Sequence, residues 1–205
     1  MFKRTLLAAS LALSFATGAS ATTLTGNITA DDAFVAYLST DNSVAGTELT
    51  SSNSWQSPSS FSAALTQGTT YYLHIAARDL YGSPSALLGS FNLSGSGFSF
   101  SNGTQSLVTN AADWTVNTTG FGAAGTTPYD GFGANGVGPW GTMGSIAPNA
   151  RWIWSGPSGT VGQAYFSTTI TAAAQAVPEP ETYAMFLAGL GLMGFLARRK
   201  QQAAA

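Results

Sequence analysis

Between Thr22 and Ala176 the sequence consists of short runs of aromatic and β-branched residues, each soon followed by glycine, serine, asparagine or proline. The runs favour extended strands and the separators favour turns. We find no convincing helix in this region, which would need apolar residues three and four positions apart. The pattern therefore predicts an all-β body over residues 22–176, arranged as a β-sandwich or jelly roll.

The strands of this body are expected at short, fairly even intervals. In the stretch 69–77, Tyr71, Leu73 and Ile75 share one face because side chains alternate along a strand, and Tyr72 and His74 share the other. The expected strands span residues 32–38, 69–77, 86–93, 97–100, 105–109, 113–117, 151–154 and 163–170.

The glycine-rich segment 120–144 leaves no comfortable room for a strand of normal length. Long connections inside compact domains are usually functional or disordered. An aromatic ring on such a loop can stack on a sugar while polar side chains bind its hydroxyl groups. Trp140 is the candidate ring, with Tyr129, Asp130 and Asn135 as its neighbours. The alternative is that Trp140 folds inward and caps the core.

The body offers few groups for catalysis. His74 is its only histidine, and no nucleophile-elbow sequence accompanies it, so a Ser-His-Asp triad is disfavoured and a packed or half-exposed strand histidine is expected. We expect no enzyme. The alternative is a polysaccharide hydrolase that uses a pair of carboxylates. Its candidate aspartates, which otherwise suit turns, are Asp31, Asp32, Asp79, Asp113 and Asp130.

The charge of the body excludes other functions. Residues 22–176 carry seven carboxylates and two arginines, a net charge of 2 − 7 = −5. Binding of nucleic-acid phosphates requires clustered lysine and arginine, so no nucleic acid is expected as a partner. The chain has no cysteine, which excludes thiolate zinc sites and disulfides. No cofactor is expected, with calcium held by aspartates as the alternative.

The first 21 residues have the organisation of a secretory signal peptide. Lys3 and Arg4 precede a short apolar run, and Ala19 and Ala21 form a small-x-small cleavage signal. The run is too short for an anchor helix. We therefore expect signal peptidase to cleave after Ala21 and the body to lie outside the cytoplasm.

The C-terminus contains an apolar stretch over residues 182–197, followed by Arg198, Arg199 and Lys200. This stretch lacks the polar face of a surface helix and contains glycines that membrane helices tolerate. We expect a single transmembrane helix at about 182–197, with the basic end at 198–200 stopping transfer on the cytoplasmic side.

Val177, Pro178, Glu179 and Pro180, the apolar stretch and the basic triplet together resemble the tripartite PEP-CTERM sorting signal of Gram-negative bacteria, over residues 177–200. The resemblance implies cleavage near the Pro-Glu-Pro by an exosortase, a membrane-embedded transpeptidase. It further implies a membrane-held intermediate with its body in the periplasm, and delivery to the cell surface or extracellular matrix.

Residues 30–42 and 150–170 resemble strands of galactose-binding-like jelly-roll domains, which often bind sugars or act as structural modules. The leading hypothesis is accordingly a non-enzymatic envelope or biofilm-matrix protein associated with exopolysaccharide. Two alternatives stay open: the carboxylate hydrolase and a glycosylated structural adhesin.

Overall fold

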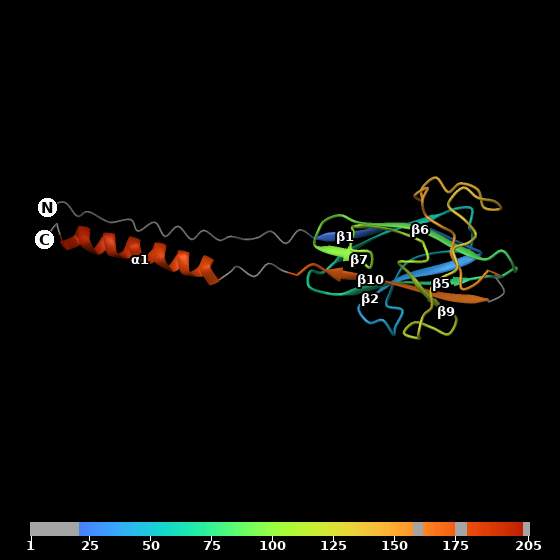
Figure 1. Ribbon diagram of the computed structural model, residues 1–205, viewed down its shortest axis with the longest axis horizontal. Coiled ribbons are helices and arrows are strands. Elements are labelled where there is room, and N and C mark those ends of the chain that lie inside the picture. The colour runs from blue at the N-terminus through green and yellow to red at the C-terminus, as the bar shows by residue number, and fades with distance from the viewer. Residues whose placement is uncertain (1–20, 158–161, 175–179, 203–205) are drawn as a thin grey trace. The chain divides into compact units, whose positions relative to one another are not determined.

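The computed structural model describes residues 21–157, 162–174 and 180–202 of the chain (Figure 1). The chain divides into two compact units, residues 1–173 and 174–205, each considered by itself below. The predicted signal peptide, including Ala19, lies outside the described residues, and Ala21 is exposed. The first strand begins at Thr22, immediately after the predicted cleavage site.

The first unit contains two antiparallel sheets. The four-stranded sheet has the order β4-β1-β6-β8, formed by Ser59–Leu65, Thr22–Asp31, Ala86–Leu93 and Ser106–Val108. The six-stranded sheet has the order β3-β2-β5-β10-β7, formed by Thr47–Ser52, Ala33–Ser39, Tyr71–Arg78, Gln163–Ala172 and Phe98–Phe100. Its sixth strand, β9 (Thr115–Asn117), also pairs with β10.

The sheets form a sandwich-like body around one main core, so the prediction of a mostly-β body is confirmed. The period of two places alternate side chains inside: in β5, Tyr71, Leu73 and Ile75 are buried on the inner face, as expected. Main-core residues from the two sheets include Leu24, Ile28, Phe91, Phe34, Leu73, Ile75 and Phe166.

Seven expected strands are present with boundaries shifted by no more than a few residues. The expected strand at 151–154 is instead a set of isolated bridges, in which Ile153 pairs with Leu87 and Trp154 pairs with Tyr129. Three strands were not expected from the sequence, namely β1, β3 and β4. They are rich in threonine and serine and carry few large apolar side chains, so their sequences resemble those of turns.

The glycine-rich segment covers part of the outside of the sandwich. Trp140, Met143 and Ile146 pack with Leu88 and Trp152 in a second apolar cluster, separate from the main core. Side chains alternate between the two faces of β6. Leu87 points into the main core, so the next residue, Leu88, points to the outer side of the four-stranded sheet. The segment therefore buries an apolar sheet face that would otherwise be exposed.

The second unit contains one helix, α1 (Pro180–Gln202). No helix among the described residues is long and apolar enough to cross a membrane, so the predicted transmembrane segment at 182–197 is not supported. The helix itself is confirmed and extends beyond both ends of the expected segment.

Candidate functional site

One groove on the surface of the body lies at a gap in strand pairing. β9 pairs with Tyr165–Ser167 of β10, and β7 pairs with Ile170–Ala172 on that same strand. Thr168 and Thr169 lie between these two pairings. The chain that leaves β7 and the chain that enters β9 line the resulting groove, which has a volume of about 320 Å³.

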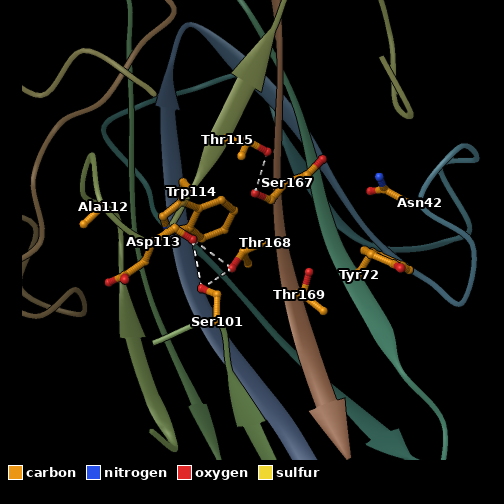
Figure 2. A pocket seen from close by; sticks show the side chains of 10 residues that line it. All are labelled: Asn42, Tyr72, Ser101, Ala112, Asp113, Trp114, Thr115, Ser167, Thr168 and Thr169. Carbon is orange, nitrogen blue, oxygen red and sulfur yellow. Dashed lines mark hydrogen bonds between the residues drawn. The ribbon is translucent and has the colours of Figure 1, made fainter. Parts of the chain in front are cut away.

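Figure 2 shows β10 running between the two sides of this groove. Trp114, Thr115 and Ser101 lie on one side, and Tyr72 and Asn42 lie on the other. The lining therefore combines one partly exposed aromatic ring, that of Tyr72, with many neutral polar groups. Its members are Asn42, Tyr72, Ser101, Ala112, Asp113, Trp114, Thr115, Ser167, Thr168 and Thr169.

Hydrogen bonds across the gap fix one wall of the groove (Figure 2). The backbone carbonyl of Asp113 accepts hydrogen bonds from Ser101 Oγ and Thr168 Oγ1, both at 3.0 Å. The two hydroxyl oxygens are themselves 2.9 Å apart. Thr115 Oγ1 donates to the backbone carbonyl of Ser167 at 3.3 Å. The hydroxyl groups thus replace the missing ladder contacts between β10 and its short neighbours.

His74 is the next residue after Tyr72 on the same face of β5 and is fully buried. Its Nδ1 is 2.8 Å from Ser167 Oγ, and its ring stacks with those of Tyr72 and Phe121, with centroids 5.9 and 4.3 Å away. Burial lowers the pKa of His74, against the opposing effects of the Asp41 backbone and carboxylate. The Tyr72 ring at the groove therefore has an aromatic neighbour within the protein.

The expected ligand loop is organised differently from the prediction. Trp140 is only 4% exposed, so the ring is not presented to solvent. It stacks on Trp152 with centroids 4.4 Å apart, and its Nε1 donates to Asp31 Oδ2 at 2.8 Å. This arrangement corresponds to the alternative, in which Trp140 folds inward as a cap.

The other residues of that loop are not gathered around Trp140 as ligand-binding groups. Asp130 forms an ion pair with Arg151 at 3.0 Å. The Asn135 side chain holds the loop together, donating to the carbonyls of Met143 and Ile146 and accepting from the Met143 amide. Tyr129, at 37% exposed, is the most accessible of the predicted set.

Three of the candidate aspartates lie close together where β1 meets β2. Asp32 accepts hydrogen bonds from the backbone amides of Leu80 and Tyr81, and Asp79 accepts from Gly82 and from Ser85 Oγ. These carboxylates hold the turn after β5. Among the described residues, no group of three or more histidine, aspartate or glutamate side chains is placed to hold a metal ion.

Asp31 has the most strongly perturbed carboxyl group of this cluster. Burial, the hydrogen bond with Asp32 and the charges of Asp32 and Asp79 together raise its pKa to about 6, against the lowering effect of the Trp140 hydrogen bond. Because the folded pKa lies above the unfolded value, the stabilising contribution of Asp31 is complete at about pH 4 and is lost as the pH rises through 6.

Replacing Asp31 with asparagine should therefore raise the melting temperature at pH 7.5 and leave it nearly unchanged at pH 4, because the variant buries no charge. Melting curves between pH 4 and 8 measure this. Asp41→Asn is the control, and it should lower the melting temperature at pH 7.5. Hydrogen bonds from Ser43 lower the pKa of Asp41 and stabilise its ionised form, which the variant lacks. A melting temperature of Asp31→Asn below the wild-type value at pH 7.5 would contradict the assignment.

Sequence reasoning identified part of the groove without recognising it. The alternation in 69–77 placed Tyr72 and His74 on one face, which the structure confirms. The gap itself depends on two short strands that pair with one edge of β10, and no local pattern specifies such a pairing.

The residues of the C-terminal motif fall partly within the described helix. Val177, Pro178 and Glu179 lie outside the described residues, and Pro180 is the first residue of α1. The basic residues Arg198, Arg199 and Lys200 lie exposed near its end. Cations at this position interact favourably with the helix C-terminus.

Comparison with protein families matches residues 176–200 to the PEP-CTERM protein-sorting motif. No curated protein and no solved structure gives a significant match to the chain. The motif implies an exported, cell-surface-associated protein that an exosortase processes. The match covers the tail alone, so evidence for the role of the body must come from the body itself.

Proposed function

We propose that the body is a non-enzymatic carbohydrate-binding module of the bacterial envelope or extracellular matrix. The C-terminal motif delivers it there. The groove beside β10 that Tyr72 lines, called the Tyr72 groove below, binds exopolysaccharide of the biofilm. Signal peptidase and exosortase are its processing partners. The motif implies how the protein is sorted, and the proposal adds a ligand for the body.

The observation that carries the proposal is the composition of the groove. Sugars have apolar ring faces and many hydroxyl groups, and proteins bind them with an aromatic ring beside neutral polar side chains. Tyr72 supplies the ring, while Asn42, Ser167 and Thr169 supply polar groups around it. The groove is open rather than enclosed, which suits a segment of polymer.

The bonding of the carboxylates supports a binding role over hydrolysis. Hydrolysis of a glycosidic bond requires two carboxyl groups facing one substrate. Asp32 and Asp79 instead bind backbone amides of the turn after β5, and Asp130 is paired with Arg151. Asp113 is the one carboxylate that lines the groove.

Tyr72→Ala should weaken binding of the full chain to its glycan about tenfold, because the stacking surface is lost. Titration calorimetry with glycans identified on an array measures the dissociation constants. Tyr81→Ala is the matched control, since Tyr81 is 89% exposed in the turn after β5 and does not line the groove.

Equal losses in the Tyr72 and Tyr81 variants, or no loss in either, would exclude the groove as the glycan site. Circular dichroism of each variant checks that the sheets are retained. Tyr72→Phe keeps the ring and should retain most of the affinity.

A further inference from the structure

The wall of the groove has a specific hydrogen-bonding character that follows from where its protons lie. His74 is fully buried among aromatic rings, and burial lowers its pKa. Its Nδ1 lies 2.8 Å from Ser167 Oγ, so one of these two atoms donates a hydrogen bond to the other. In either case Ser167 Oγ keeps a lone pair that a ligand in the groove can use.

Several other hydroxyl protons of this wall are committed to neighbouring protein groups. Ser101, Thr168 and the Asp113 carbonyl form a closed triangle, so both hydroxyl protons stay within it. Thr115 donates to the Ser167 carbonyl. Because a hydroxyl group has one proton and two lone pairs, the exposed oxygens of Ser101 and Thr115 can still accept a hydrogen bond from a ligand, whereas Thr168 is buried.

Three nitrogen donors on this side of the groove are committed as well. The backbone amides of Ala112 and Asp113 both donate to Asn110 Oδ1 at 2.8 Å. The Trp114 indole donates to the carbonyl of Val108 at 3.1 Å. The wall formed by β10 and the chain entering β9 is thus rich in acceptors and poor in free donors.

No cation compensates for this shortage of donors. Asp113 supplies the one charged side chain among the lining residues. Of the two arginines in the body, Arg151 is paired with Asp130, and Arg78 ends β5 beside Gln163, at the other end of β10 from Thr169. The donors that remain are neutral groups of Asn42, Tyr72 and Thr169.

We propose that the groove selects uncharged, hydroxyl-rich glycans and discriminates against polymers that carry uronate, sulfate or phosphate groups. The inference rests on the proposed function and names its ligand class. A neutral sugar donates hydroxyl protons to the wall. An anionic group can only accept, so beside this wall it would be desolvated without a partner.

The test uses the full chain on a panel that pairs neutral glucans, galactans and mannans with their oxidised and sulfated counterparts. Neutral members should bind, and each anionic counterpart should bind at least tenfold more weakly at about 0.15 M salt, where long-range repulsion is screened. Preferential binding of anionic members that Tyr72→Ala abolishes would overturn this inference and leave the proposed function intact. Binding to no glycan would overturn both.

A second variant separates the effect of the hydrogen-bond acceptors in the wall from the effect of the protein's net charge. Ser167→Ala removes one acceptor without changing charge, and it should weaken neutral glycans about fivefold to tenfold. Thr171→Ala is the matched control, because Thr171 is an exposed β10 residue outside the groove lining. Equal affinity of the two variants for neutral glycans would refute the acceptor role of the wall.

Discussion

Replacing Trp140 with alanine should lower the free energy of unfolding by about 3–5 kcal/mol, the usual cost of removing a large buried aromatic side chain. The Trp140 ring stacks on Trp152, and its indole donates to the Asp31 carboxylate. The variant loses the contacts of the second apolar cluster and leaves the outer face of β6 poorly covered. Chemical denaturation followed by circular dichroism measures the change.

Trp140→Phe is the control for this prediction, because it keeps an aromatic ring over Trp152 and removes only the indole hydrogen bond. It should cost less than half as much as the alanine change. A Trp140→Ala variant that unfolds like the wild type but no longer binds glycan would contradict the structural role and restore the ligand-loop hypothesis.

Replacing Pro178, Glu179 and Pro180 together with alanine should block processing of nearly all of the protein. These residues give the matched motif its name and lie within the matched residues 176–200. The chain should then keep its tail and remain with the cells. Intact-mass measurement of the cell-associated and released protein detects both effects.

Gln201 and Gln202 provide the control, since they follow the matched residues 176–200 directly. Their replacement with alanine should leave processing unchanged. Release of the triple-alanine chain with the same C-terminus as the wild type would show that the motif is not the sorting signal.

Much of the fold could be predicted because the strongest strands carry their own signal. The alternation in β5 and the apolar run of β6 were sufficient to place both elements and their inner faces. β1 carried no such signal, because Gly26 interrupts it. An added side chain there would meet the rings of Phe61 and Phe91 at 2.6 Å, so glycine is needed in the centre of this strand.

The glycine-rich segment shows where prediction from sequence was insufficient. The same local sequence is compatible with a tryptophan exposed on a loop and with a tryptophan buried against the sheet. Which one forms depends on Trp152 and Leu88, whose apolar outer face needs covering. Asn135 is equally ambiguous, since amide groups serve both as sugar ligands and as clamps for loop backbones.

The resemblance of residues 30–42 and 150–170 to galactose-binding-like domains stays a prediction. The first stretch contains β2, and the second contains the isolated bridges and β10. Both are consistent with a β-sandwich. Neither stretch supplies the groove alone, because Ser101, Asp113 and Tyr72 lie outside them.

The most direct test of the account is cosedimentation of the mature protein with extracellular polysaccharide isolated from the organism that produces it. We expect the wild type and Tyr81→Ala to sediment with the polymer and Tyr72→Ala to remain in the supernatant. If Tyr72→Ala sediments as completely as the wild type, the groove does not hold the protein in the matrix, and the central claim is wrong.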